Sequence, residues 1–352
     1  MYTLYDGESE ETDVHLTVML PQTNKAASPQ AIRDIASAAE ELGFFGITVH
    51  DHLVFNGWWV VSGMRGFEGP GDDRDLFEAL ETLGYVAAIT DRIRLSVSVV
   101  VVSMRKPVAL AKQVATIDAL SGGRLRLGVG VGPPLKPMER ETTQLGAHRA
   151  NARREYDASG LRGERGRRTD EYLRAMIEIW TTDKASFEGE FVSFEDIEVF
   201  PKPVQEPYPP LFVGGRSDHA LRRAARFGAG WVPSQVSVEE VAAGRTRLAD
   251  LYEQHSVDGA AEIVVNLPVV LADSDEAAQA VARPTARPLF PGEQEFNERT
   301  IVGSPAVFAA RLREYRDAGV SNVELKPLYP DLDNFIWQLE TLQSEVVPML
   351  AD

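Results

Sequence analysis

The sequence contains no cysteine in its 352 residues. A disulfide framework, a thiolate nucleophile and a cysteine-ligated metal are therefore excluded. Long apolar runs are absent too, since none reaches the roughly 18 residues that a membrane-spanning helix needs. The first thirteen residues are acidic and polar, without the basic and apolar stretches of a secretory signal. We therefore expect a cytoplasmic protein.

Positive charge is scarce as well, with 36 Lys and Arg residues against 53 Asp and Glu residues and a net charge of −17. Such a surface repels phosphate backbones and anionic lipids, so neither a nucleic acid nor a membrane is an expected partner. One segment departs from this balance: residues 149–168 hold seven arginines and three acidic residues, a local net charge of +4. This segment is either a solvated loop or a clamp for an extended anionic group.

Short apolar runs alternate with helix-length amphipathic stretches along most of the chain. Strands are predicted at residues 14–20, 45–50, 93–102, 124–129, 211–214, 230–233, 263–270 and 323–326, and helices at residues 29–42, 76–89, 107–120, 169–180, 218–227, 238–255, 275–282 and 332–347. Alternation of this kind is typical of a parallel sheet, and eight parallel strands close as a barrel. The pattern predicts a single (β/α)8 TIM-barrel domain over residues 1–352.

Three segments interrupt the alternation, near residues 55–74, 133–168 and 283–297, and all are rich in glycine, proline or charge. We interpret them as insertions after strands, on the side where the loops of a barrel build its active site. The first two are expected to form lids or walls of that site. Disorder is the alternative interpretation.

The most informative chemical motif is His50-Asp51-His52, at the end of the second predicted strand. Residues 50 and 52 share a face of an extended chain and could bind one metal, but the other four histidines do not lie at strand ends to complete the shell. No metal is therefore expected. A carboxylate beside a histidine suits proton transfer, so His52 is the predicted catalytic residue. A histidine held by loop backbone is the structural alternative.

Two glycine-rich segments also follow strands. Gly128-Val-Gly-Val-Gly132 lacks dinucleotide-binding spacing and precedes Pro133-Pro134, which argues against a Rossmann fold but still permits close approach to a flat ring. Gly214-Gly215-Arg216-Ser217 offers backbone N–H groups and a guanidinium to a phosphate. A tight turn with an N-cap serine would give the same pattern.

Taken in order, several segments resemble the luciferase-like oxidoreductases, a barrel family that uses either FMN or the deazaflavin coenzyme F420. The resemblance rests on Ala39–Phe44 before Asp51-His52, on Arg92–Leu95, on Arg105–Pro107 with Ala111–Gln113 and Leu120–Arg124, on Gly128–Gly132, and on Pro201–Pro203 with Pro209-Pro210, Gly214-Gly215 and Gly230-Trp231.

The resemblance is closest to the deazaflavin branch and implies coenzyme F420, with FMN as the alternative. It implies that Asp51 contacts the cofactor and that His52 takes part in proton transfer. It also implies a non-proline cis peptide at Ser98 and Val99 behind the ring, with Gly130, Val131 and Gly132 flanking it. Gly214, Gly215 and Arg216 would hold the cofactor phosphate, and the arginine-rich segment would suit the oligoglutamate tail of F420.

Two departures from the family pattern concern the substrate side. The link from the glycine run to the Glu-Tyr pair, matched here to Glu155-Tyr156, is longer than usual, and Pro133 replaces a glutamate found in some members. The expected function is hydride transfer between the deazaflavin and a small organic substrate. The resemblance also implies a homodimer, and a separate reductase for the cofactor is a further expected partner. The alternatives are an FMN-dependent monooxygenase that uses reduced flavin and O2, and a non-catalytic flavin-binding barrel.

Overall fold

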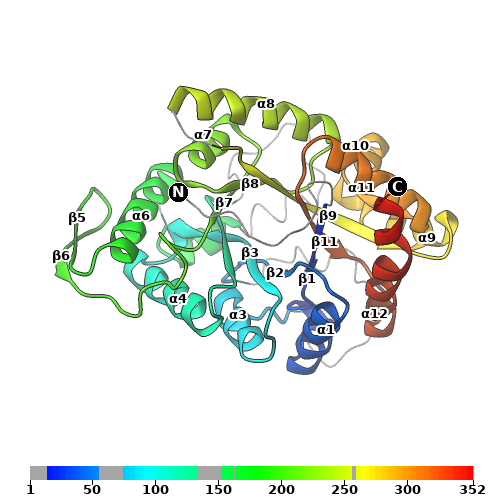
Figure 1. The fold of residues 1–352 in the computed structure, drawn as a ribbon, viewed down its shortest axis with the longest axis horizontal. Coiled ribbons are helices and arrows are strands. Elements are labelled where there is room, and N and C mark those ends of the chain that lie inside the picture. The colour runs from blue at the N-terminus through cyan, green and yellow to red at the C-terminus, as the bar shows by residue number, and fades with distance from the viewer. Residues whose placement is uncertain (1–13, 55–73, 133–151, 162, 256–258, 352) are drawn as a thin grey trace.

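The computed structural model describes residues 14–54, 74–132, 152–161, 163–255 and 259–351. At its centre eight parallel strands form a closed barrel, with helices around it (Figure 1). Neighbouring strands follow the order β1, β2, β3, β4, β7, β8, β9, β11 and back to β1. The predicted TIM barrel is therefore confirmed. The strands are β1 (His15–Met19), β2 (Gly46–Val49), β3 (Arg94–Val101), β4 (Leu125–Gly130), β7 (Leu211–Gly214), β8 (Gly230–Val232), β9 (Glu262–Leu271) and β11 (Asn322–Pro327).

The helices cover the outside of the barrel, which is why its strands are apolar on both faces and read as β-branched runs. They are α1 (Pro29–Glu41), α3 (Ala79–Ala87), α4 (Pro107–Leu120), α6 (Arg165–Thr181), α7 (Asp218–Phe227), α8 (Val238–His255), α9 (Asp275–Thr285), α10 (Glu293–Glu298), α11 (Pro305–Asp317) and α12 (Leu332–Thr341). Single turns of 3-10 helix lie at Asn24–Ala26, Val102–Met104, Arg287–Leu289 and Val347–Leu350, and a π-helical turn at Leu342–Val346 extends α12.

Local signals set many helix boundaries. The Ser28 side chain accepts a hydrogen bond from Ala31 N at the start of α1, and Pro29 occupies the first turn. Asp331 caps α12 in the same way through Asn334 N. Gly43, at φ +81°, follows the end of α1 and adopts the left-handed backbone that glycine favours. These side chains explain why the predicted helix starts are close to the observed ones.

Three strands escaped the sequence prediction. β5 (Ala185–Glu188) and β6 (Ser193–Ile197) form an antiparallel hairpin that projects at the left edge of Figure 1. β10 (Ile301–Gly303) pairs with the last three residues of β9, Val269–Leu271, whereas β11 pairs with β9 from Val264 to Val269. All three strands are short, and the hairpin is largely exposed, so the sequence has no long apolar run that would predict them.

Two of the predicted insertions are corrected by the structure. Residues 283–297 follow helix α9 rather than a strand and contain its last turn, a 3-10 turn and most of α10. They are ordered around a small apolar cluster in which Ala282, Leu289 and Phe296 are buried. Within 133–168, residues 152–158 are helical and α6 begins at Arg165, four positions before the predicted start at Thr169. Residues 55–73 and 133–151 lie outside the described residues.

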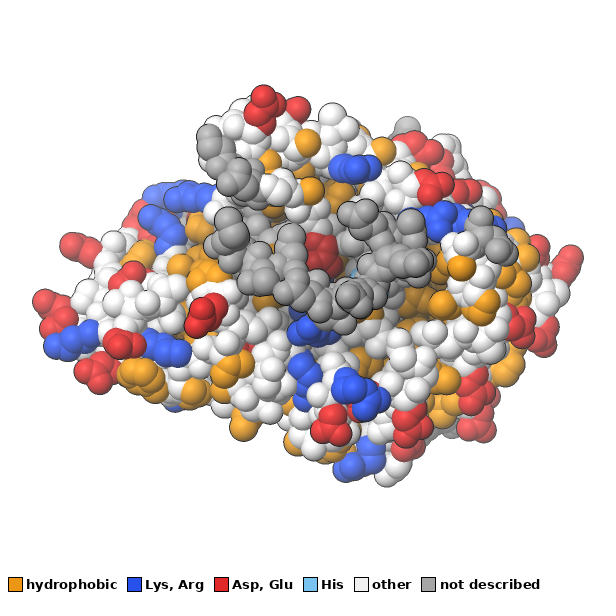
Figure 2. All heavy atoms as spheres, viewed as in Figure 1, with side chains coloured by type: hydrophobic (Ala, Val, Ile, Leu, Met, Phe, Trp, Pro, Cys, Tyr) orange, Lys and Arg blue, Asp and Glu red, His pale blue; other side chains and the backbone are white. Residues whose placement is uncertain are grey.

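Charged side chains lie mainly around the rim of the face in Figure 2, on the outward sides of the helices. In the described part of the chain, no helix combines the length and the apolarity needed to cross a membrane.

Candidate active site

All ten predicted site residues line one cavity of about 610 Å³ at the carboxyl ends of the barrel strands. They are Asp51, His52, Ser98, Val99, Gly130, Val131, Gly132, Gly214, Gly215 and Arg216. The volume lies within the range of small-molecule and cofactor sites. Eight further residues line the cavity and were not among the ten predicted site residues: His50, Val101, Arg165, Ser217, Val232, Ser234, Gln235 and Asn266.

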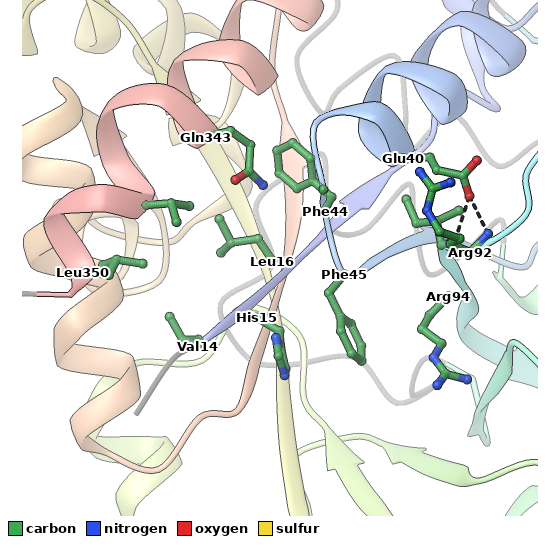
Figure 3. A pocket seen from close by; sticks show the side chains of 13 residues that line it. Val14, His15, Leu16, Glu40, Phe44, Phe45, Arg92, Arg94, Gln343 and Leu350 are labelled. Carbon is green, nitrogen blue, oxygen red and sulfur yellow. Dashed lines mark hydrogen bonds between the residues drawn. The ribbon is translucent and has the colours of Figure 1, made fainter. Parts of the chain in front are cut away.

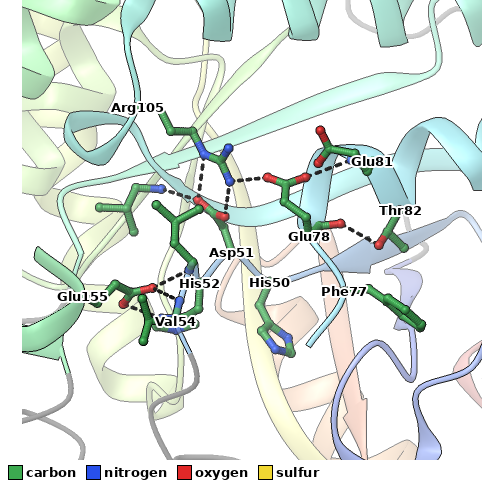
Figure 4. A network of polar contacts seen from close by, with 12 residues as sticks. His50, Asp51, His52, Val54, Phe77, Glu78, Glu81, Thr82, Arg105 and Glu155 are labelled. Atoms are coloured by element: carbon green, nitrogen blue, oxygen red, sulfur yellow. Dashed lines mark hydrogen bonds and ion pairs between the residues drawn. The ribbon is translucent and has the colours of Figure 1, made fainter. Parts of the chain in front are cut away.

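His52 is held by a buried carboxylate from a distant part of the chain. Its Nδ1 lies 3.0 Å from Oε2 of Glu155, while Oε1 of Glu155 accepts hydrogen bonds from Leu53 N at 2.5 Å and Val54 N at 3.3 Å (Figure 4). Burial alone would raise the pKa of Glu155, but these hydrogen bonds hold that pKa below its usual value. An ionised carboxylate only accepts, so Nδ1 carries the proton and Nε2 the lone pair of the neutral ring.

Asp51 joins the end of β2 to the end of β3. Its carboxylate accepts from Val101 N at 3.1 Å and pairs with Arg105 at 2.5 Å, and Arg105 also pairs with Glu78 (Figure 4). Asp51 is only 2% exposed, which an ionised carboxylate tolerates because it is paired and hydrogen-bonded. Arg105 belongs to one of the family motifs, but the sequence does not show that it pairs with Asp51.

The peptide between Ser98 and Val99 is cis, as the resemblance implied. The register between β3 and β4 shifts at this point, between Val97 and Val100. The side chain of Val99 then fills the space left by two glycines: a Cβ on Gly130 would lie 2.5 Å from Val99 Cγ2, and one on Gly214 would lie 2.9 Å from Val99 Cγ1. Val99 and these two glycines lie together in the wall of the cavity.

Arg165, one of the seven clustered arginines, ties the glycine segment to the start of α6. It donates to Val131 O at 3.1 Å, to Gly132 O at 3.3 Å and to the Tyr156 hydroxyl at 2.9 Å. Gly132 has φ +73°, and a Cβ there would lie 2.2 Å from the Tyr156 hydroxyl oxygen. The cavity wall at residues 131–132 therefore depends on Tyr156 and Arg165 together.

The second glycine segment connects β7 to α7. Ser217 caps α7 by accepting from Ala220 N at 3.3 Å, as in the tight-turn interpretation. Trp231 Nε1 donates to Gly215 O at 2.7 Å, and Arg216 donates to Gln235 O at 3.2 Å. Gly215, Arg216 and Ser217 line the cavity, so the N-terminus of α7 lies at its wall, where a helix favours an anion.

Beneath the cavity a buried carboxylate supports two wall residues. Glu324 of β11 accepts from Ser98 Oγ at 2.8 Å and from Asn266 Nδ2 at 3.2 Å. Burial raises the pKa of Glu324 despite these bonds. The signal that could have revealed it is the spacing of Glu324 and Lys326 within an apolar strand, because alternate residues of a barrel strand face the interior.

A second cavity, of about 450 Å³, lies at the opposite end of the barrel, by the amino ends of β1 and β3 (Figure 3). There Glu40 of the Ala39–Phe44 motif accepts from Arg92 N at 2.7 Å and from Ile93 N at 2.9 Å, so it anchors the turn before β3. Barrel enzymes work at the carboxyl ends of their strands, and the larger cavity is therefore the candidate active site.

The chain belongs to the luciferase-like monooxygenase family, whose model matches residues 14–297. An uncharacterised protein of Mycobacterium tuberculosis is 31% identical over 258 residues, 71% of this chain and 83% of that protein. The FMNH2-dependent dimethylsulfone monooxygenase of Pseudomonas putida is 31% identical over 250 residues, 71% of this chain and 60% of that enzyme. The F420-dependent glucose-6-phosphate dehydrogenase of Kineococcus radiotolerans is 26% identical over 349 residues, 92% of this chain and 94% of that enzyme.

Solved structures share the fold. An F420-dependent secondary alcohol dehydrogenase superposes with a TM-score of 0.76 at 16% identity, over 96% of this chain and 99% of its own. The monooxygenase RslO1 from Streptomyces bottropensis gives 0.74 at 20% identity, over 95% and 99%. The chain is thus an oxidoreductase of the luciferase-like family, in which both F420-dependent and FMN-dependent relatives occur.

Proposed function

We propose that the protein binds the deazaflavin coenzyme F420 and transfers a hydride between it and a small organic substrate. The observation that carries the proposal is the convergence of all ten predicted site residues on one cavity, with His52 oriented by Glu155. The similarity to an F420-dependent dehydrogenase over 92% of the chain supports the same cofactor.

The residues present fit such a group. The cavity has room for a flat ring system, and Gly130, Val131 and Gly132 form part of its wall. The N-terminus of α7, with Gly214, Gly215 and Arg216, would hold the phosphate. When bound, the coenzyme supplies the carbon that accepts or gives the hydride.

The protein's own contribution is orientation and proton handling. Glu155 keeps the proton of His52 on Nδ1, so Nε2 is the atom that can accept a proton from the substrate or, in the charged ring, return it. Asp51 and Arg105 fix the strand end that carries His52. A small organic substrate, a homodimeric assembly and a separate cofactor reductase are part of the proposal.

The experiment is a titration of the purified protein with F420 and with FMN, each oxidised and reduced, followed by tryptophan fluorescence. Trp231 is a built-in reporter, because its indole contacts Gly215 at the proposed phosphate site. Micromolar or tighter binding of F420 alone would support the proposal. Selective binding of reduced FMN would favour an oxygen-using monooxygenase, as the 31% identity to the dimethylsulfone enzyme suggests. Binding of neither would refute a cofactor role for the cavity.

A further inference from the structure

Glu324 is a carboxyl group in the interior of the barrel, beneath the candidate active site. It lies on β11 and is only 3% exposed. The space beside it is about 10 Å³, which has room for at most one water molecule, and Ser98 also lines this space. Ser98 is half-buried and lines the large cavity as well. Glu324 is therefore shielded from bulk water, and Ser98 lies between it and the cavity.

The hydrogen bonds of Glu324 determine which of its two oxygens can carry a proton. Asn266 Nδ2 donates to Oε2 at 3.2 Å, and an amide nitrogen can only donate. Ser234 Oγ donates to Oδ1 of the same amide at 3.4 Å, which agrees with this orientation of Asn266. A proton on the carboxyl group therefore occupies Oε1, the oxygen that lies 2.8 Å from Ser98 Oγ.

The protonation state of Glu324 sets the direction of the Ser98 hydroxyl. Within the part of the chain that the structure describes, Glu324 is the hydrogen-bond partner of Ser98 Oγ. When Oε1 carries the proton, Ser98 accepts it, and its own hydrogen is left for a group in the cavity. When Glu324 is ionised, Ser98 donates to it and can only accept from the cavity. The neutral acid thus makes Ser98 a hydrogen-bond donor at the cavity wall.

The surroundings of Glu324 favour the neutral acid. Burial has the largest effect on the pKa of Glu324 and raises it. The effects that lower this pKa are smaller: the hydrogen bonds with Ser98, Asn266 and Thr48 and the charge of Arg126. Arg126 of β4 also pairs with Glu262, which offsets part of its charge. Glu324 therefore keeps its proton to a higher pH than an exposed glutamate does.

We propose that Glu324 and Ser98 form a proton relay to the cofactor in the cavity. The Oε1–H bond of Glu324 breaks as an O–H bond forms at Ser98 Oγ, and Ser98 passes its own hydroxyl proton to the cofactor. Glu324 is left ionised and regains a proton from water through Ser98. This inference rests on the proposed function, because it supplies the proton that accompanies the hydride onto the cofactor.

The relay gives the two protons of the reaction to separate groups. His52 exchanges the proton of the substrate, on the side of the cavity where Glu155 holds it. A ring that accepts a hydride gains negative charge, and an acid positioned beside it neutralises that charge. Glu324 is that acid and Ser98 its contact with the cavity. When the reaction runs in the other direction, the same steps are reversed.

The first test is infrared spectroscopy of the full-length protein without ligand at neutral pH. We expect the carbonyl band of a protonated carboxylic acid, identified by its loss in Glu324→Gln. Ser98→Ala should shift this band, because the acid loses its hydrogen-bond acceptor. Glu188→Gln, at an exposed position on β5, is the control and should leave the band unchanged. If Glu324→Gln removes no such band, Glu324 is ionised and the relay is overturned.

The second test is the rate at which bound F420 is reduced by an N-benzyl dihydronicotinamide, which gives a hydride without a proton. Glu324→Gln preserves the hydrogen bonds of the neutral acid, because its amide oxygen can accept from Asn266 while its NH2 group donates to Ser98. It should therefore bind F420 and unfold like the wild type. Bound F420 should nevertheless be reduced at least about 10-fold more slowly, because the amide cannot act as a general acid.

Ser98→Ala leaves the acid in place and should slow the reduction as much. A purely structural role of Glu324 predicts a normal rate in Glu324→Gln, so a wild-type rate in either variant overturns the relay. Cofactor titrations of the same proteins separate the two proposals. If F420 binds and the variants reduce it at the wild-type rate, the relay fails and the proposed function stands. If no cofactor binds, the proposed function fails, and the relay fails with it for want of an acceptor.

Discussion

At the scale of single residues, Glu155 has the clearest consequence. One of its carboxylate oxygens accepts a hydrogen bond from His52 Nδ1, and the other accepts from the backbone N–H groups of Leu53 and Val54. Glu155→Gln replaces two acceptors by one acceptor and one donor, so either His52 must change its tautomer to accept from the amide or the two N–H groups lose their acceptor. We expect a loss of roughly 1–3 kcal/mol in unfolding free energy. Chemical denaturation measures this loss.

The same substitution should change the tautomer of His52. In the wild type, ¹⁵N spectra should show Nδ1 protonated, and in Glu155→Gln this preference should weaken. Glu188→Gln, at an exposed position on β5, is the control and should leave both stability and spectrum unchanged. A wild-type spectrum with the proton on Nε2 would contradict the assigned role of Glu155.

His50 predicts a pH dependence of stability. Its pKa is lowered in the folded protein by burial, Lys326 and His52, so below about pH 6.5 the unfolded chain takes up a proton that the folded protein does not. Unfolding free energy should therefore fall as the pH drops below that value. His50→Gln removes this contribution and should show a smaller decrease between pH 6.5 and 5, measured by urea denaturation.

The control for His50 is His219→Gln, because His219 is exposed at the start of α7. This variant should follow the wild-type pH dependence. If His50→Gln and the wild type lose the same free energy over this range, His50 is not held neutral by the fold.

At the scale of elements, Val99 connects three strands by packing against Gly130 of β4 and Gly214 of β7. Gly130→Ala should cost about 1–3 kcal/mol of unfolding free energy, because its Cβ would lie 2.5 Å from Val99 Cγ2. Val99→Ala in the same chain should recover part of the loss. Gly84→Ala is the matched control: it lies within α3 with open space around it and should stabilise by about 1 kcal/mol.

A double variant no more stable than Gly130→Ala alone would show that Val99 is not the obstacle. The contact would then not account for the glycine at this position.

The helical residues 152–158 present two different faces. Ala152, Glu155 and Tyr156 are buried, whereas Arg153 and Arg154 are exposed. Arg153 and Arg154 therefore lie on the outer face of the helical turn whose Glu155 contacts His52. This face is accessible to a negatively charged cofactor tail. We expect Arg153→Glu with Arg154→Glu to weaken F420 binding at least 10-fold in low-salt fluorescence titrations.

The matched control is the deazaflavin core without its phosphate and glutamate tail, whose affinity for the double variant should be unchanged. Unchanged F420 affinity would exclude these two arginines from tail binding. Other members of the cluster serve the protein itself: Arg165 binds the glycine segment, and Arg167 pairs with Glu164 and Glu190.

At the scale of the whole molecule, the cavity wall is assembled from the ends of several barrel strands, so a ligand bound there links distant parts of the chain. F420 at 100 times its Kd should raise the unfolding free energy by about 2.7 kcal/mol. Thermal unfolding should therefore shift upward by several degrees with F420 and not with the same concentration of oxidised FMN. A shift with FMN alone would contradict the proposed cofactor.

The sequence by itself determined the architecture and ten of the residues that line the cavity. Hydrophobic periodicity located the eight barrel strands, because burial on both faces leaves a continuous apolar run. Parallel strands in a closed barrel end at one rim, so motifs at strand ends, such as Asp51-His52 and Gly214-Gly215, had to meet there. The exposed β5–β6 hairpin and short β10 left no such signal.

Only the tertiary structure decided which groups are partners. Glu155 lies 103 positions from His52, and Ser98 lies 226 positions from Glu324, so no local pattern could pair them. The contacts of Val99 with Gly130 and Gly214 likewise join residues of three different strands, which no local pattern could pair. Lys326 of β11 and His50 after β2 line one small cavity because closure of the barrel brings its last strand, β11, beside its first, β1.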